Sequence, residues 1–533
     1  MVLPAGVSQT NFSSAIRQFQ EAVGRQWVFT SDEDVHLYRD AYSPYWGEKE
    51  ELLPSAALAP DSVEQVQTIV RIANQYKIPL YPISTGMNLT YGGSAPTYSG
   101  SVMVDLKRMN RILDVNIDGA TCLVEPGVSY FDMYRYLREN KIPLWIDCPD
   151  PGWGSLLGNA LDRGVGQTMG DFRFHFDAHC GMEVVMANGD VVRTGMGANP
   201  VAETWQQYKY GMGPWVDGIF SQSNFGIVTK MGFWLMPEPE GALQVTIEAP
   251  KREDIHAFVA IQARLMYLNI IPSRGMIVSP IVGGSMNPEL YALRTKPGGA
   301  SSAEWDRYAQ SKGRPFWRST VTYYGTRKMI EAQWEHTKEQ FSVIPGVKFT
   351  ENAWYKFPLT DEQVDQVSTS KAMLGIPSLT VFATRSDADS PPRQTHNDFS
   401  PMVPRTGAAF LQALDVCAQV FAKYGFEFLG NIGARESGRC LNVLHEVIFT
   451  KDPEQNKKAR ALFAELVDVC GQHGWGDYRV HPFWQEKAMS YYSFDNHSLH
   501  RLHETLKDAV DPNGILSPGR YGIWGKRLRE ARR

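Results

Sequence analysis

The sequence predicts an α+β fold of more than one domain, on three observations. Its 533 residues suffice for about two to four domains. Short apolar strands alternate with amphipathic helices, and residues 182–192 form a clear hairpin pattern with an Asn-Gly turn. After residue 239 the pattern changes to longer amphipathic helices. We expect an α+β domain at 1–240, a second at 241–475, and a segment at 476–533 that returns to the first.

The elements of the first half follow from apolar periodicity. Ser62 and Gln65 predict a capped helix start, and the apolar residues that follow occupy one helical face. An apolar strand begins near residue 78 and leads into a glycine-rich loop. Further strands are predicted at 101–106, 121–128 and 221–236, with helices at 131–140 and within 149–170.

In the second half, residues 243–249 alternate like a strand. Residues 457–469 and 498–510 are amphipathic helices, and the latter stops at Asp-Pro-Asn-Gly.

Composition narrows the function classes. Charged residues make up 21% and the net charge is −5, with no long basic run in the body of the chain, so no nucleic-acid partner is expected. Six scattered cysteines without a CxxC indicate free thiols in a reducing compartment. No apolar run approaches about 18 residues, and the N-terminal residues lack a secretory pattern. We therefore expect a cytoplasmic protein without a membrane partner.

The glycine-rich loop, within IPLYPISTGMNLTYGGSAPTYSG at 78–100, is the first candidate site. Small residues let the backbone approach a bulky anion, and free N–H groups and hydroxyls can bind its oxygens. The spacing is neither GxGxxG nor that of a P-loop, so the residues alone leave an ordinary glycine-rich turn open. The residues concerned are Ser84, Thr85, Gly86, Asn88, Thr90, Gly92 and Gly93.

Several other polar or aromatic residues stand out, each with a plain structural alternative as a turn, surface or strand residue. They are Tyr91, Asp150, Asp171, His396, Tyr478 and Arg479. His175 and His179 lie four apart beside Cys180, a spacing that suggests a metal. No glutamate accompanies them as in HExxH, and their aromatic neighbours favour a strand, so no metal site is expected.

Seven blocks in order carry a family resemblance over nearly the whole chain. They are PLYPISTGMNLTYGGSAP, VEPGVSYFDMYRYL, DCPDPGWGSLLGNALDRGVG, GMEVVMANGDVVRTGMGA, SQSNFGIVTKMGFWLMP, WGDYRVH and VDPNGILSPGRYGIW. The chain resembles the vanillyl-alcohol oxidase/4-cresol dehydrogenase family of flavoproteins. The resemblance implies an FAD-binding domain made from both chain ends and a cap domain, containing an antiparallel sheet, made from the middle.

The resemblance also implies which residues hold FAD. The glycine-rich loop would bind the pyrophosphate through Ser84, Thr85, Gly86, Asn88 and Gly92. Other positions that match FAD-contacting blocks are Pro149, Gly154, Ser155, Gly158, Asn159, Gly164, Ile227 and Arg520. His396, in H-x-x-F-S-P, matches the residue that bonds covalently to the flavin. Residues 379–395 contain no tyrosine for the tyrosyl linkage of the 4-cresol dehydrogenase branch.

Family substrates are para-substituted phenols, and Tyr91, Tyr478 and Arg479 match the residues that bind the phenol oxygen. Two hydroxyl donors and a permanent cation lower the pKa of a phenol from about 10. The phenolate then favours loss of a hydride from the benzylic carbon to flavin N5, which gives a quinone methide. A nearby carboxylate can assist water addition or proton movement. Asp150 fits that role, with Asp171 as the alternative.

The chain departs from the family pattern at three places. Gln167 and Met169 replace aromatic and proline residues, and the stretch at 171–180 is about three residues longer, as judged from the motif spacing. Asn397 and Asp398 replace apolar or aromatic residues after the linking histidine. If Asp398 faces the pocket, the substrate is expected to be larger or more polar than vanillyl alcohol or eugenol.

Three functions stay open at this point. The first is a phenol oxidase that is reoxidised by O2 and releases hydrogen peroxide. The second performs the same chemistry but passes electrons to a cytochrome, a route that a secretory signal would favour. The third is a flavin-binding protein without turnover. Related proteins form dimers or dimer-based octamers, so a homodimer is expected.

Overall fold

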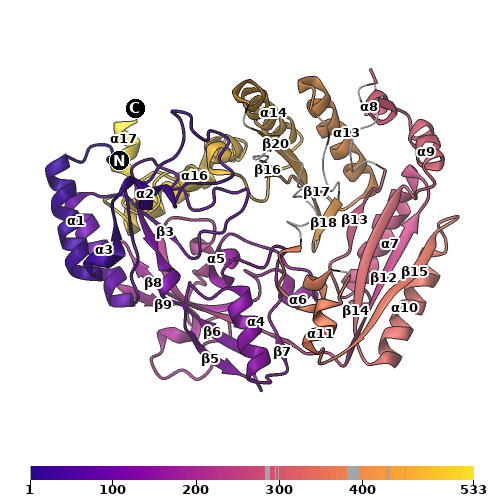
Figure 1. Cartoon of the computed structure of the whole chain (residues 1–533), viewed down its shortest axis with the longest axis horizontal. Coiled ribbons are helices and arrows are strands. Elements are labelled where there is room, and N and C mark those ends of the chain that lie inside the picture. Colours follow the sequence, from indigo (N-terminus) through magenta and orange to yellow (C-terminus); the bar gives the residue numbers. More distant parts are fainter. Residues whose placement is uncertain are drawn as a thin grey trace.

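Two halves are visible in the computed structural model (Figure 1). The N-terminal portion and the C-terminal segment lie together on one side, and the middle of the chain lies on the other. The residues described are 2–281, 288–294, 296–297, 299–368, 370–380, 395–426, 428, 433–450 and 452–532. Within these ranges, no helix combines the length and the apolarity that crossing a bilayer requires.

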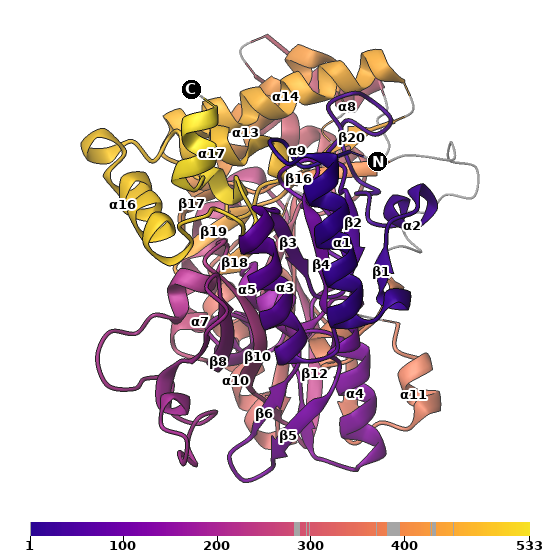
Figure 2. The same ribbon diagram turned by 90° about the vertical axis from the view of Figure 1, so that its left-hand side faces the viewer.

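A four-stranded sheet carries the loop that the sequence singles out. Its strands β2 and β3 run parallel to β4, and β1 pairs antiparallel with β2. Helices α1 and α3 pack together against this sheet through a shared apolar core (Figure 2). The elements are α1 (Gln9–Val23), β1 (Val28–Phe29), β2 (Ala56–Leu58), α3 (Val63–Tyr76), β3 (Leu80–Ile83) and β4 (Val102–Asp105).

The predicted start of α3 is confirmed with one difference in detail. Ser62 accepts the backbone N–H of Gln65, as a capping residue should. The Gln65 side chain, however, accepts the N–H of Asp61 and not that of Ser62. The helix therefore begins where expected, but the hydrogen bond that the Gln65 side chain accepts comes from the backbone of Asp61, one residue before the capping serine.

A five-stranded antiparallel sheet follows, in the order β5-β6-β10-β8-β9. It contains the predicted hairpin, because β8 pairs with β9 across the Asn-Gly turn. Helices α4 and α5 contribute to its apolar core. The elements are β5 (Ile112–Asn116), β6 (Thr121–Val124), α4 (Tyr130–Glu139), α5 (Leu156–Leu161), β8 (His179–Met186), β9 (Val191–Arg193) and β10 (Gly226–Trp234).

The middle of the chain forms a seven-stranded sheet in the order β15-β12-β14-β13-β18-β19-β17, in which every pair is antiparallel. The strands are β12 (Gly241–Ala249), β13 (Met276–Val278), β14 (Trp317–Gly325), β15 (Lys348–Lys356), β17 (Met402–Pro404), β18 (Gly433–Ser437) and β19 (Cys440–Val443). A separate ribbon, β16 (Thr395–Phe399) with β20 (His445–Phe449), lies beside it.

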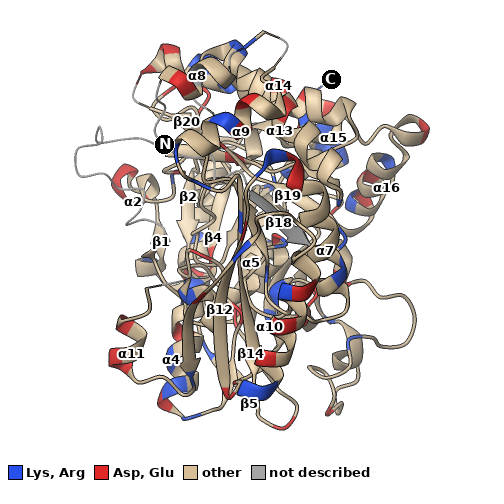
Figure 3. Cartoon of the chain, turned by 90° about the vertical axis from the view of Figure 1, so that its right-hand side faces the viewer, with Lys and Arg blue, Asp and Glu red and all other residues tan. Residues whose placement is uncertain are grey.

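Helices with apolar faces pack against this part of the chain. Their cluster centres on large buried side chains such as Phe258, Trp317 and Phe410. The helices are α7 (Ile255–Tyr267), α10 (Arg327–Phe341), α13 (Gly407–Tyr424) and α14 (Pro453–Gln472). Acidic and basic residues occur together on α10 and on α16, which begins at Phe494 (Figure 3).

The remaining short elements connect these layers. They are α2 (Asp32–His36), β7 (Leu144–Trp145), α6 (Gly170–Arg173), β11 (Met236–Pro237), α8 (Pro288–Arg294), α9 (Ser302–Ser311), α11 (Asp361–Asp365), α15 (Gln485–Met489), α16 (Phe494–Val510) and α17 (Lys526–Ala531). Three residues near the start of α16 have left-handed backbone angles, so its regular helix begins at the predicted residue 498.

The C-terminal segment joins the first sheet edge to edge. Leu80 of β3 donates its N–H to Ile515 and accepts the N–H of Ser517. Lys507 of α16 is completely buried, lies 2.7 Å from an Asp511 oxygen, and donates to the carbonyls of Asn224 and Leu516. The exact limits of the domains stay a prediction.

We predict that Asp511→Ala lowers stability by about 3–5 kcal/mol, because it leaves the buried Lys507 charge without its partner. The midpoint of thermal unfolding measures this change. Asp508→Ala, which removes the partly exposed pair between Asp508 of α16 and Arg529 of α17, is the control and should cost at most about 1 kcal/mol. Equal melting temperatures for the two variants would show that the buried pair does not anchor the segment.

Candidate functional site

The loop after β3 turns back on itself through residues with left-handed backbone angles. Gly86 has φ +70°, Gly92 +107° and Gly93 +53°, and a Cβ atom at Gly86 would overlap the hydroxyl oxygen of Ser94. The backbone N–H groups of residues 85–88 donate to no other part of the chain that the structure describes. A row of free donors in such a loop forms an anion cradle.

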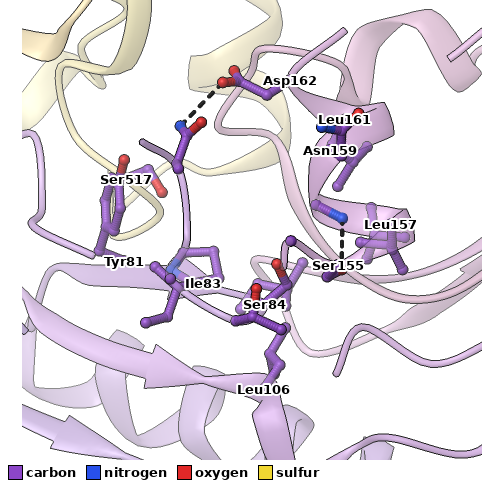
Figure 4. Close-up of a pocket in the computed structure, with 18 of the residues that line it drawn as sticks. Tyr81, Ile83, Ser84, Leu106, Ser155, Leu157, Asn159, Leu161, Asp162 and Ser517 are labelled. Atoms are coloured by element: carbon purple, nitrogen blue, oxygen red, sulfur yellow. Dashed lines mark hydrogen bonds between the residues drawn. The ribbon is translucent and has the colours of Figure 1, made fainter. Parts of the chain in front are cut away.

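A cavity of about 170 Å³ opens above this cradle, and we call it the cofactor cavity. Its walls come from the loop after β3, from α5, from the start of β10 and from the C-terminal segment. Ser84 and Ser155 lie near one another at one end, and Asp162 lies at the other (Figure 4). The close approach needs a glycine, because a Cβ atom at Gly158 would overlap the Ser84 hydroxyl.

Most residues that the resemblance assigns to FAD line this cavity. They are Ser84, Thr85, Gly86, Asn88, Gly154, Ser155, Gly158, Asn159, Ile227 and Arg520. Gly92 and Gly164 line neither this cavity nor the neighbouring one that contains Tyr91. A Cβ atom at Gly92 would lie 2.7 Å from Pro482, and one at Gly164 would overlap the Asn159 side chain, so both glycines permit close packing behind the walls.

A second cavity adjoins the first, since Met87, Asn88, Gly154 and Asn159 line both. It brings together residues from six segments of the chain, at 87–91, 149–165, 274, 396–400, 442–444 and 478–479. The chemically active ones are Tyr91, Asp150, Arg274, His396, Asp398, Tyr478 and Arg479, and Pro149 is among the others. The two tyrosines and the arginine that the sequence assigned to phenol binding are therefore in one place.

Arg479 organises this tyrosine pair. Its guanidinium carbon lies 4.2 Å from the ring centroid of Tyr91 and 5.3 Å from that of Tyr478. Burial, followed by the negative charge of Asp398, raises the pKa of Tyr91 well above its usual value, so this hydroxyl keeps its proton. Burial lowers the pKa of Arg479, but Tyr478, Asp162 and Tyr91 together raise it, so the cation is permanent.

Asp162, at the end of α5, connects the two cavities. One carboxylate oxygen accepts Arg520 at 2.8 Å and Tyr521 at 3.3 Å. The other accepts Asn88 at 3.1 Å and Arg479 at 3.4 Å. A single carboxylate thus fixes an arginine of each cavity.

Sequence reasoning missed both Asp162 and Arg274. Asp162 offered a signal, namely a charge directly after an apolar helix and inside a quoted block (LDRG). Arg274 offered none, because its place in the cavity depends on packing of the middle of the chain against the N-terminal part.

The two candidate carboxylates are placed differently. Asp150 lines the second cavity. Asp171 lies on α6, is exposed, and lines neither cavity. Of the two candidates, only Asp150 therefore lies in the cavity that contains Tyr91, Tyr478 and Arg479.

His396 and Asp398 lie two residues apart on β16, and Glu446 is opposite Asp398 on β20. His396 Nε2 is 3.7 Å from an Asp398 oxygen, and one nitrogen or oxygen atom from each of the three residues lies within 4.8 Å of the others. The expectation of no metal stays a prediction. Residues 381–394, most of the segment without tyrosine, lie outside the described ranges.

His175 and His179 have structural partners. His175 Nε2 is 2.7 Å from Asp147, and His179 Nε2 is 3.0 Å from Asp217, with all four side chains buried. Asp147 also accepts the N–H groups of Gln167 and Thr168, which fixes the loop where the sequence departs from the family pattern. Each histidine is therefore held by a buried aspartate. The expected strand is confirmed for His179, which begins β8, and is wrong for His175, which lies in the turn between α6 and β8.

Comparison with known proteins adds three kinds of match. The family described as "FAD binding domain" matches residues 54–195, and "FAD linked oxidases, C-terminal domain" matches residues 411–521. The flavoprotein subunit of 4-cresol dehydrogenase (hydroxylating) from Pseudomonas putida is 34% identical over 98% of both chains. The 1'-carboxy-chondrochloren decarboxylase of Chondromyces crocatus is 30% identical over 87% of this chain and 90% of its own.

Two solved structures match the fold over nearly the whole chain. The isoeugenol complex of 4-ethylphenol oxidase from Gulosibacter chungangensis is similar with a TM-score of 0.86 at 33% identity, covering 99% of this chain and 100% of that one. Substrate-bound p-cresol methylhydroxylase gives 0.85 at 32% identity, covering 98% and 99%. The fold is therefore a two-domain FAD-binding fold, and FAD is the cofactor.

We predict that Gly158→Ala reduces FAD incorporation, since the added methyl group overlaps Ser84 on the cavity wall. The ratio of flavin absorbance to protein measures the loss. Ser84→Gly in the same chain removes the overlapping side chain and should restore part of the incorporation, because the backbone donors of the cradle remain although the Ser84 hydroxyl is lost. Gly170→Ala, where nothing lies within 4 Å, is the control. Unchanged flavin content in Gly158→Ala would contradict the placement of FAD at this wall.

Proposed function

Because the chain belongs to the vanillyl-alcohol oxidase/4-cresol dehydrogenase family of flavoproteins, we propose that it oxidises para-substituted phenols at the benzylic carbon. It is an FAD-dependent oxidoreductase, and bound FAD supplies a hydride acceptor. The proposal rests on one observation: Tyr91, Tyr478 and Arg479 line a single cavity that adjoins the cofactor cavity.

The residues of the second cavity suit this chemistry. A phenol oxygen held by the Tyr91 and Tyr478 hydroxyls beside the Arg479 cation is stabilised as phenolate, whose free pKa is about 10. Phenolate charge delocalises to the para position and weakens the benzylic C–H bond toward hydride loss. Asp150, in the same cavity, can take a proton from the water that adds to the resulting quinone methide.

We assign the covalent flavin link to His396. The residue is 8% exposed, sits on β16 and lines the second cavity together with residues shared by both cavities. Tyr42 packs edge-on against its ring at 5.4 Å, which supports a fixed ring orientation.

For the electron acceptor we favour O2, with release of hydrogen peroxide. One relative is named an oxidase and another a dehydrogenase, so a cytochrome-linked enzyme is the alternative. A flavin protein without turnover is disfavoured by the assembled tyrosine–arginine set. Because Asp398 lines the second cavity, we also favour a substrate more polar than a plain 4-alkylphenol.

The wider assignments remain proposals. We place the FAD-binding domain at 1–240 with 476–533, and the cap domain at 241–475. A cytoplasmic location is supported by six free cysteines. A homodimer follows from the resemblance, and size-exclusion chromatography with light scattering tests it.

We expect anaerobic addition of a para-substituted phenol such as 4-ethylphenol to bleach the flavin absorbance, and turnover under air to form one peroxide per product. Arg479→Met should lower kcat/KM about 10²–10³-fold, because a charge that stabilises the phenolate is lost. Arg307→Met, at an exposed site on α9, is the control. Bleaching without peroxide would indicate another acceptor, and no bleaching by any phenol would refute the proposed activity.

We expect acid-precipitated protein to stay yellow, because flavin bound through His396 cannot be washed out. His396→Ala should give a colourless pellet while the native variant still binds FAD. Mass spectrometry of the peptide containing residue 396 measures the added mass directly. A yellow pellet from His396→Ala would place the bond on another residue.

A further inference from the structure

Asp398 is a carboxylate in the second cavity that the phenol chemistry above does not use. Its side chain is 15% exposed. One oxygen accepts the Thr90 hydroxyl at 3.1 Å and the Tyr91 hydroxyl at 3.4 Å. The other oxygen is buried and accepts no hydrogen bond from the described residues. Asp398 is therefore joined directly to one of the two hydroxyls assigned to the substrate oxygen.

Titratable side chains from several segments of the chain lie near Asp398. His396 comes from its own strand and Glu446 from β20, opposite in register. The segment after α14 contributes Asp477, Tyr478 and Arg479, and the glycine-rich loop contributes Tyr91. Asp150 and the cation Arg274 line the same cavity. The Tyr91 hydroxyl already donates to Asp398, so a phenolate bound at the same hydroxyl would add a second negative charge beside this carboxylate, which is electrostatically unfavourable.

This electrostatic cost disappears if negative charge moves from one group of the site to another, so that the total charge of the site stays the same. We propose that Asp398 accepts the phenol proton through Tyr91: the substrate O–H proton passes to the Tyr91 oxygen, and the Tyr91 proton passes to Asp398. One O–H bond breaks and one forms at each step, and the negative charge moves from Asp398 to the substrate oxygen. This inference rests on the proposed phenol oxidation.

The other carboxylates suit this role less well. Burial raises the pKa of Asp477 well above its usual value, and its Oδ1 accepts the backbone N–H groups of Ser400 and Arg479, not the Tyr91 hydroxyl. Glu446 lies on the neighbouring strand β20, opposite Asp398. Among the hydrogen bonds of the described residues, the one that the Tyr91 hydroxyl donates goes to Asp398. Asp398 is thus the acceptor that the hydrogen-bond chain reaches.

Proton counting tests the assignment. The probe is 4-nitrophenol, which has no benzylic hydrogen and whose ionised form is coloured, bound to the FAD-loaded protein below the probe's own pKa. We expect binding to give the absorbance difference spectrum of the phenolate. We also expect no proton to be released to the solvent, which titration calorimetry in two buffers of different ionisation enthalpy measures. By linkage, the affinity for the neutral probe should then be independent of pH over about one unit.

Asp398→Asn is nearly isosteric and cannot accept the proton. We expect it to release about one proton per probe bound, and its affinity to rise about tenfold per pH unit below the pKa of the probe. Glu446→Gln, the carboxylamide change at the facing residue, is the matched control and should release none.

Release of one proton by the unmodified protein would overturn the inference, even if Asp398→Asn fails to fold. A proton release that appears in Glu446→Gln but not in Asp398→Asn would also overturn it. If 4-nitrophenol does not bind the unmodified protein as phenolate, then the proposed phenol site itself fails, which is a different result from binding with proton release.

Discussion

The site depends on one buried carboxylate held between two arginines. Asp162 bonds Arg520 in the cofactor cavity and Arg479 in the second cavity, and it also accepts Asn88 from the glycine-rich loop. Two positive charges in a protein interior would be costly without a shared counter-charge. With it, both guanidinium groups are fixed relative to one another at the end of one short helix.

Balance between opposite charges also explains how the second cavity accommodates several acidic groups. Arg479 lies over Tyr91 and near Tyr478, so the aromatic faces share its positive charge. The carboxylates Asp150 and Asp398 of this cavity lie on separate segments, and burial raises the pKa of the neighbouring Asp477 well above its usual value. Proton movement from substrate to Asp398, as proposed above, would keep the total charge of the cavity constant.

Much of the fold was predictable, because the N-terminal elements have clear local signals. The hairpin at 182–192, the capped start of α3 and the helix from residue 498 follow from turn residues and apolar periodicity. The roles of the candidate site residues came instead from the family resemblance, because local pattern alone left each of them open as a turn, surface or strand residue. Arg274 and the pairing of Asp398 with Glu446 were not predicted, since they depend on how the middle of the chain packs and on strand register, which no local pattern encodes.

The edge-to-edge pairing of Leu80 with Ile515 and Ser517 has a consequence for biosynthesis. Arg520 and the strand partner of β3 are translated after every other wall of the cofactor cavity. On the ribosome, the nascent N-terminal sheets have an open edge and a nucleotide cradle that lacks its arginine. The cavity is therefore completed only when the last part of the chain emerges, so stable capture of the nucleotide follows translation.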